Sequence, residues 1–457
     1  MKNLKKLVNE LRSFLILWST QALSALGSSM TGFALIIWSY QQKESALTTA
    51  LLSVCSYAPY VMMSIFAGAL SDTWNKKTTL LICDSFAALC TVMVLILLRV
   101  GNLEIWHLYA LNALNGLMNT VQQPASDVTI SILTPKKHYQ RISGMRSFSN
   151  SLVSILTPSA AAAILAVSGV QAVLLFDLAT FAAAFLSLLF FVKIPETYEK
   201  EKSSDQEQEG TVWQSAGAGL RYLRDNRGIL DLILFLSAIN LTASVYNAAL
   251  PAMLLSREGG GEAALGIVNT ATGIALLAGS IITSVLPAPG SRVKVICNTL
   301  LVSMGTENFF LAFGRSVPAW CTGAVLGWIC IPIMNANMDV LFRDSIPITM
   351  QGRVFSARNT LQFFTIPIGY FLGGILVDKV FEPFMASQNA GHITVLLFGE
   401  GKGSGAALLF FALALTGIIT CLVFRRDPHI WALEKKRKSD DLTGAAPSPS
   451  APSDSKD

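Results

Sequence analysis

The sequence is dominated by long stretches of apolar residues, and this pattern restricts the fold to one broad class. The stretch from Leu47 to Leu70, for example, contains no lysine, arginine, aspartate or glutamate. A helix rises about 1.5 Å per residue, so a stretch of this length can cross the roughly 30 Å hydrocarbon core of a bilayer. Hydrophobic residues make up 52% of the chain and charged residues 14%, which is too apolar for a water-soluble protein. The sequence therefore predicts an all-α membrane protein.

Twelve segments have the length and the apolar character of a membrane-spanning helix. Their approximate bounds are 14–40, 47–70, 78–98, 105–133, 142–167, 170–192, 229–255, 263–286, 295–313, 318–342, 354–377 and 405–424. An even number of crossings places both termini on the same side of the membrane. We expect residues 1–192 and 229–426 to form two six-helix bundles. Residues 193–228 would be a linker with an interfacial helix, and residues 427–457 a disordered tail.

Basic residues are concentrated in the loops on the side of the termini. The loops predicted on the other side contain only Lys43, Arg99, Arg257, Arg315, Lys379 and Lys402. Cytoplasmic loops of membrane proteins carry the excess of lysine and arginine, so both termini are predicted to be cytoplasmic. The net charge of +5 is spread between the apolar stretches and does not form a basic patch, which argues against nucleic-acid binding. We expect a multi-pass protein of the cell membrane, with the lipid bilayer as its surroundings.

The loop between the second and third segments has the sequence GALSDTWNKK, residues 68–77. Gly68 would let two helices approach closely, and Asn75 can adopt the left-handed turn conformation that glycine favours. Asp72 could bind a neighbouring helix N-terminus or an arginine, and Lys76 and Lys77 could anchor the loop at the headgroups. A plain hydrophilic turn with basic flanks is the alternative.

This loop resembles the signature loop of the major facilitator superfamily. The positions that match its pattern are Gly68, Leu70, Ser71, Asp72, Lys76 and Lys77, whereas Thr73 and Asn75 replace its arginine and glycine. The segment GLRYLRDNRG, before the seventh apolar stretch, resembles the bacterial macrolide-efflux and siderophore-export branches of that superfamily. The resemblance implies the major facilitator fold, in which twelve transmembrane helices form two pseudo-symmetric bundles around a central cavity.

The two halves of the chain also resemble each other. Asp127, Pro135, Arg141 and Arg146 recur as Asp339, Pro347, Arg353 and Arg358, each 212 residues later. A shared offset for four residues indicates a parallel repeat. We expect these acids and arginines to join the signature loop in an inner gate, in which Asp72 binds the eleventh span near Arg353 and Arg358 when the cavity faces outward. The alternative is that the arginines only anchor the headgroups.

Polar residues within the apolar stretches are candidates for lining a cavity, because an unpaired polar group facing lipid is costly. Glu307 is the strongest candidate, as a proton carrier or as the counter-ion of a cationic substrate; an interhelical hydrogen bond is the alternative. Asp84 and Asp177 rank lower, because a helix-end dipole or a basic loop accounts for each more simply. The amide candidates are Gln21, Asn112, Asn115, Asn119, Asn240, Asn247, Asn335 and Asn337, and each could equally make an interhelical hydrogen bond.

Enzymatic chemistry finds no support in the sequence. The seven cysteines lie inside apolar stretches, and the four histidines show no metal-ligand or catalytic-triad spacing. The segment Gly399–Gly405 lacks the spacing of a phosphate-binding loop. We therefore expect no cofactor and no metal.

The family resemblance implies a secondary active transporter that works as a monomer by alternating access. It implies a proton-coupled antiporter that exports an amphipathic small molecule such as a macrolide or another drug, and so confers drug resistance. Two alternatives remain open: transport of a small metabolite or siderophore, and a non-transporting receptor on the same scaffold.

Overall fold

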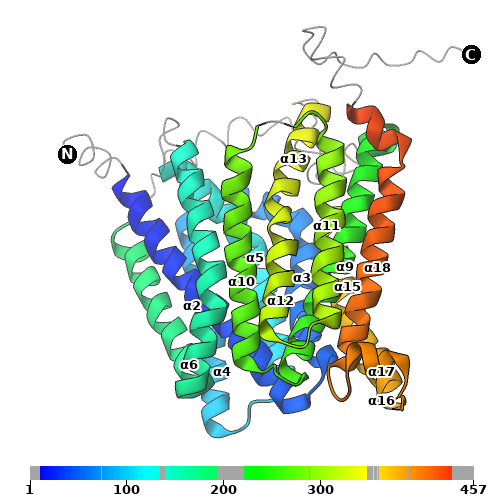
Figure 1. Ribbon diagram of the computed structural model, residues 1–457. Coiled ribbons are helices and arrows are strands. Elements are labelled where there is room, and N and C mark those ends of the chain that lie inside the picture. The colour runs from blue at the N-terminus through cyan, green and yellow to red at the C-terminus, as the bar shows by residue number, and fades with distance from the viewer. Residues whose placement is uncertain are drawn as a thin grey trace, which may run out of the picture.

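The structure, a computed structural model, describes residues 11–73, 75–133, 139–192, 221–287, 289–346, 354, 358, 360–389 and 391–434. Within these ranges the secondary structure is helical and contains no strand. The long helices run roughly side by side along one direction, as expected for a protein that crosses a bilayer (Figure 1).

The described part of the N-terminal half consists of long helices. They are α2 (Arg12–Lys43), α3 (Ala46–Thr73), α4 (Lys76–Val100), α5 (Ile105–Leu133) and α6 (Tyr139–Phe190). The 52 residues of α6 contain a kink at Gly169, whose φ of 72° suits glycine because this residue lacks a Cβ. The predicted fifth and sixth spans are therefore the two arms of α6.

The C-terminal half repeats this pattern with more interruptions. Its elements are α9 (Arg227–Ser256), α10 (Glu262–Val285), α11 (Arg292–Phe313), α12 (Val317–Trp328), α13 (Cys330–Ser345), α15 (Thr365–Ile375), the π-helix η3 (Leu376–Phe381), α16 (Glu382–Ala386), α17 (Ile393–Phe398) and α18 (Ser404–Arg425). The tenth span is divided into α12 and α13 at Ile329, three residues before Pro332. Because proline cannot donate the helical hydrogen bond, this break has a local cause.

Ten described helical stretches are long and apolar enough to cross a membrane. One of them, Met145–Phe190, contains the kink at Gly169 and comprises two predicted spans. The helix α5 is not among the ten, although its 29 residues exceed the length that a crossing needs. Its sequence contains three asparagines and two glutamines, which lower its hydropathy. The predicted fold of twelve helices in two bundles is confirmed.

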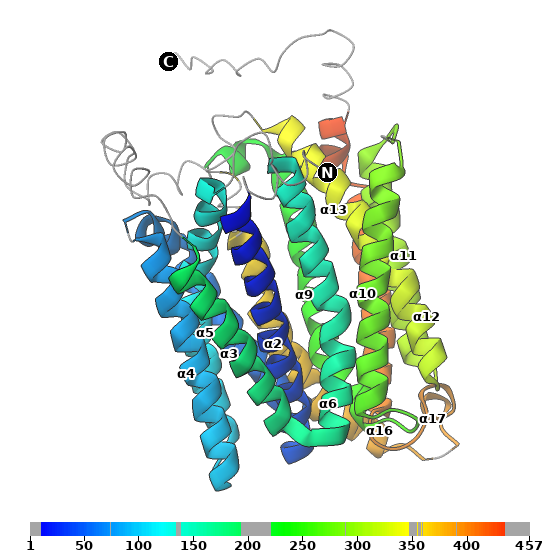
Figure 2. The same ribbon diagram turned by 90° about the vertical axis from the view of Figure 1, so that its left-hand side faces the viewer.

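The two halves stand side by side, with α3, α4 and α5 on the left of Figure 2 and α10, α11 and α12 on the right. They contact each other where α6 packs on α10 and where α3 packs on α15. At the second contact, a Cβ on Gly374 would lie 2.6 Å from the Cα of Leu47. Only glycine allows the two backbones to come this close.

The first described helix begins and the last long helix ends at the same end of the bundle, at the top of Figure 1. We call this end the terminal side and the other end, where α16 and α17 lie, the opposite side. Most of the predicted linker, residues 193–220, and the tail from residue 435 lie outside the described residues. Residues 221–225 are helical, and Leu223 is fully buried against the helices of the C-terminal half. The exact domain bounds stay predictions.

The signature loop differs from the prediction at Asn75. This residue has an extended backbone with φ −63° and ψ 117°, so the left-handed conformation predicted for it is wrong. Its side chain instead caps α4, where Oδ1 accepts a hydrogen bond from the backbone N–H of Thr78 at 3.1 Å. A free N–H at the start of a helix needs an acceptor, and asparagine supplies one.

Both lysines of the loop contact the protein. Lys76 is 6% exposed. The Nζ of Lys77 donates to the carbonyl oxygens of Leu189 at 3.0 Å and Val192 at 2.8 Å, next to the end of α6. A cation at this position satisfies carbonyl groups that the helix leaves unpaired. Lys77 therefore holds α6 against α4. The sequence predicted only that this lysine anchors the loop at the headgroups.

Candidate functional site

Among the described residues, several cavities lie within the helical bundle. One, of about 540 Å³, is lined mainly by residues of α2, α4, α5 and α6, and we call it the N-terminal cavity. The second, about 300 Å³, lies mainly among α9, α11, α12 and α13, and we call it the C-terminal cavity. A third cavity of about 150 Å³ lies between the two halves.

The amides predicted from sequence are distributed over these cavities. The N-terminal cavity is lined by Gln21, Asn112, Asn115 and Asn119. The C-terminal cavity is lined by Asn240, Asn247 and Asn335. Asn337 is not among the lining residues and accepts a hydrogen bond from Arg292 at 3.1 Å. Their contact with a substrate stays a prediction.

Glu307 lies on the wall of the C-terminal cavity and is 4% exposed. Its Oε1 accepts hydrogen bonds from the hydroxyl of Tyr246 and from Nε1 of Trp328, the latter at 2.5 Å. Helices α9, α11 and α12 thus converge on one carboxylate. A Cβ on Gly327 would lie 2.6 Å from the Cβ of Glu307, so α12 can approach only because this residue is glycine. The carboxylate is therefore held firmly by two neutral donors.

Asn308, next to Glu307, provides a further acceptor in the C-terminal cavity. It is 2% exposed, and its Nδ2 donates to the carbonyl oxygen of Met304 at 2.7 Å. Its Oδ1 is buried and has no hydrogen-bond partner among the described residues. A buried acceptor without a donor is costly, so a donor from a ligand would be favourable here.

Asp84, which the sequence ranked below Glu307, is 9% exposed and lies on the wall of the N-terminal cavity. Its carboxylate accepts hydrogen bonds from Nε2 of Gln21 at 3.0 Å and Nε2 of Gln122 at 2.6 Å. A helix-end dipole does not account for it, because its partners are side chains of α2 and α5. The available signal was an acid inside one apolar stretch and glutamines inside two others.

Asp177 is held in the same cavity by hydroxyl groups. It is 4% exposed and accepts hydrogen bonds from Ser28 at 3.0 Å, Thr31 at 3.0 Å and Thr91 at 3.2 Å. Gly27 makes this possible, because a Cβ there would lie 3.0 Å from the Cα of Asp177. The two helices α2 and α6 can therefore pack closely enough for the hydroxyls to reach the acid.

The predicted gate residues form two equivalent ion pairs on the terminal side. Arg146 lies 2.7 Å from Asp127, and Arg358 lies 3.7 Å from Asp339. The two pairs are related by the sequence offset of 212 residues, and each joins residues of one half. The surroundings of Gly68, the side chains of Asp72 and Arg141, and the whole of Arg353 lie outside the described residues. Pairing of Asp72 with the eleventh span stays a prediction.

On the opposite side, Asp378 joins the two halves. Its carboxylate accepts hydrogen bonds from the backbone N–H groups of Ala46 at 3.0 Å and Leu47 at 2.9 Å, and from the hydroxyl of Ser45 at 2.5 Å. The Ser45 hydroxyl also accepts from the N–H of Thr48 at 3.1 Å. The free N–H groups at the start of α3 thus have two acceptors: Ser45, in the same half of the protein, and Asp378, in the other half.

Two further contacts connect the halves on this side. Lys402 forms an ion pair with Glu44, and Gln41 donates a hydrogen bond to Glu262. Together with Asp378, these residues define what we call the opposite-side latch. It connects the two halves at this end of the molecule.

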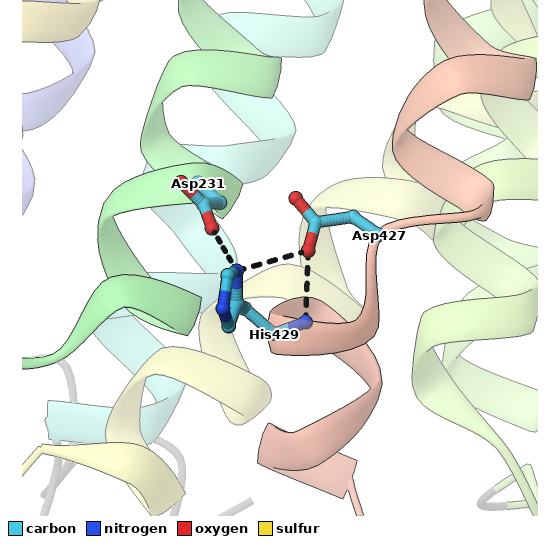
Figure 3. Close-up of side chains that lie close together, drawn as sticks. All are labelled: Asp231, Asp427 and His429. Carbon is cyan, nitrogen blue, oxygen red and sulfur yellow. Dashed lines mark hydrogen bonds and ion pairs between the residues drawn. The ribbon is translucent and has the colours of Figure 1, made fainter.

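A cluster of possible metal ligands, Asp231, Asp427 and His429, lies on the terminal side and was not predicted (Figure 3). Nδ1 of His429 lies 3.0 Å from Asp231 and 3.4 Å from Asp427, and the backbone N–H of His429 donates to Asp427 at 2.8 Å. These interactions connect α9 to the segment that follows α18. Asp231 is far from His429 in the sequence, and Asp427 is only two residues from it. Neither separation has the spacing of a known metal-binding motif.

Comparison with known proteins supports a transporter. Macrolide efflux protein A of Streptococcus pyogenes is 20% identical over 370 residues, which cover 80% of this chain and 90% of that protein. The protein of the same name from Enterococcus faecalis is 20% identical over 321 residues, covering 70% of this chain and 97% of that protein. The uncharacterized MFS-type transporter YfiS of Bacillus subtilis is 20% identical, with coverages of 82% and 89%.

Solved structures share the fold. A bacterial homologue of the iron transporter ferroportin in an inward-facing state aligns with a TM-score of 0.65 and 16% identity, covering 91% of this chain and 99% of that one. The nucleoside transporter NupG aligns with a TM-score of 0.61 and 14% identity, with coverages of 90% and 99%. The profile of the Major Facilitator Superfamily matches residues 17–286. This chain therefore belongs to the major facilitator superfamily and is a multi-pass membrane transporter, not an enzyme.

Proposed function

We propose that this protein is a proton-coupled antiporter that exports an amphipathic small molecule across the cell membrane by alternating access. Glu307 carries the proposal. Its carboxylate is buried on the wall of the C-terminal cavity, and both of its hydrogen-bond donors are neutral. A charge at membrane depth is costly without a cation or water, so the group favours its protonated form unless the cavity admits water.

Alternating access would then couple the proton to the substrate. When the cavity is hydrated from one side, Glu307 can release its proton there and take up another after the cavity opens to the other side. The amides of both cavities, including Asn115, Asn119 and Asn240, would contact the substrate. Monomers suffice for this cycle, because both cavities lie inside one chain.

The direction of transport is inferred from the charge pattern and the relatives. The excess of basic residues on the terminal side assigns that side to the cytoplasm. The opposite-side latch would then be extracellular, and the conformation described here would be closed to the outside. The relatives from Streptococcus pyogenes and Enterococcus faecalis carry the name macrolide efflux protein, which supports export and an amphipathic substrate.

Reconstituted vesicles with an imposed proton gradient test this function. The purified full chain should accumulate a macrolide or a lipophilic dye only while the gradient is present. Glu307→Gln keeps the shape and removes the titratable group, so it should lose gradient-driven uptake and keep exchange of labelled for unlabelled substrate. Glu400→Gln, the same change at an exposed loop position, is the matched control. Full gradient-driven transport by Glu307→Gln would refute the role of this residue, and no transport by the wild type would refute the function.

A further inference from the structure

We propose that the N-terminal cavity binds the ammonium group of an amphipathic amine at Asp84. This inference deepens the proposed function and rests on it, because it names the chemical class of the transported molecule and the half of the protein that recognises it. Glu307 lies in the other cavity and is not part of this site.

The surroundings of Asp84 offer more acceptors than donors. A carboxylate can accept about four hydrogen bonds, and Asp84 accepts one on each oxygen, from Gln21 and Gln122. About half of its capacity therefore remains available. Across the same cavity, Oδ1 of Asn115 is buried without a hydrogen-bond partner among the described residues. A ligand that brings N–H donors would satisfy these acceptors.

The charge balance of the cavity favours a cation. Asp84 and Asp177 both line it, and Arg146 is the one basic side chain among the described lining residues. Arg146 is already engaged, because it forms an ion pair with Asp127 at 2.7 Å. A buried carboxylate without a basic partner gains most from a ligand that is positively charged.

Asp84 is the better anchor of the two acids. Asp177 accepts three hydroxyl hydrogen bonds, so about one of its four acceptor positions remains. Asp84 accepts only two hydrogen bonds, so about two of its four acceptor positions remain. Its donors are glutamine side chains, which can rotate. The preferred ligand group is therefore an ammonium with at least one N–H, bound at Asp84.

The rest of the cavity suits an apolar body. Its volume of about 540 Å³ lies within the range of about 300–1,000 Å³ that accommodates drug-sized molecules. Trp18, Leu35, Leu178 and Phe181 contribute to its lining. Asp84 would bind the ammonium group of an amphipathic amine, and the apolar side chains would contact the rest of that molecule.

A pair of fluorescent probes isolates the ammonium. Dansylcadaverine carries a primary ammonium, and its N-acetyl derivative has the same apolar body without the charge. Their affinities for the purified full chain in detergent are measured by fluorescence titration, which needs no proton gradient. We expect the amine to bind the wild type about tenfold more tightly or better, as is typical of a hydrogen bond to a charged group.

Variants then locate the site. Asp84→Asn should abolish the preference for the amine and leave the affinity for the acetylated probe unchanged, which also shows that the cavity is intact. Asp84→Glu should retain the preference, and Asp225→Asn, the same substitution at an exposed position outside both cavities, is the matched control.

The inference would be overturned if the Asp84→Asn variant still bound the amine more tightly than the acetylated probe. This result would point to Glu307 instead if the Glu307→Gln variant had lost that preference. The proposed function fails separately. Amine binding at Asp84 without gradient-driven transport would refute the antiporter and leave the binding site in place.

Discussion

Removing the carboxylate of Asp378 should open the opposite side of the molecule. In the structure this group accepts three hydrogen bonds, from Ser45 and from the first turn of α3, and all three cross from one half of the protein to the other. These bonds exist only while the two halves touch at this end. Their loss in Asp378→Ala therefore destabilises the closed conformation and leaves an open one unaffected.

The size of the effect follows from the geometry. An N-terminal capping interaction contributes about 0.5–2 kcal/mol, and a negative charge at a helix N-terminus about 0.3–1 kcal/mol at a partly exposed site. Asp378 supplies both, whereas Ser45 continues to cap the N–H of Thr48 in the variant. We expect a loss of about 1–3 kcal/mol, which raises the ratio of open to closed molecules roughly 5- to 150-fold.

Distances between spin labels at Gln42 and Glu400 measure this ratio. Both positions are exposed on the opposite side and belong to different halves. The seven native cysteines are replaced first, and the protein is studied in lipid nanodiscs. Asp378→Ala should increase the population with the longer distance, whereas Glu258→Ala, an exposed acid on the same side, should not. If the two variants give the same distance distribution, Asp378 does not hold the halves together.

Three further substitutions test the packing. Gly27→Ala would place a Cβ 2.3 Å from Oγ1 of Thr180, so it should lower stability by about 1–3 kcal/mol. Gly32→Ala, with open space around it, should not lower the melting temperature, because alanine favours a helix more than glycine does. Burial lowers the pKa of Arg257 to about 10, and the still-charged group donates to the carbonyls at the end of α11. Arg257→Ala should therefore lower the free energy of unfolding by about 2–4 kcal/mol, and Arg257→Lys should lower it less. Equal melting temperatures of the two variants would contradict this. Lys77→Ala should lower stability by about 1–2 kcal/mol through loss of two carbonyl contacts, measured as tryptophan fluorescence against temperature with Lys43→Ala as control.

The spans could be predicted because their signal is local. Apolar length alone locates a membrane helix, and the shared offset of Asp127 and Asp339 shows the repeat without any knowledge of packing. Both ion pairs at the terminal side contain residues of that repeat. Features that repeat along the chain are therefore accessible from a single sequence.

The contacts between helices were not accessible, because they depend on how each helix is rotated. The hydrogen bonds of Asp84 come from α2 and α5, and hydropathy does not say which face of a helix meets which neighbour. Asp378 was missed for the same reason, since its partners at the start of α3 lie more than 300 residues away in the chain. Asn75 was misjudged because one residue can serve either a turn or a helix cap, and only the adjacent N–H decides.

The polar composition of α5 has a consequence for how the protein enters the membrane during synthesis. Amides at the centre of a helix oppose its transfer into lipid, so α5 gains little by leaving the translocon alone. Gln122 finds its partner Asp84 on α4, and α5 packs against both α3 and α4. These helices are made before α5, so the groups that shelter its amides are in place when it emerges. We therefore expect α5 to enter the membrane together with α3 and α4, and not as an independent helix.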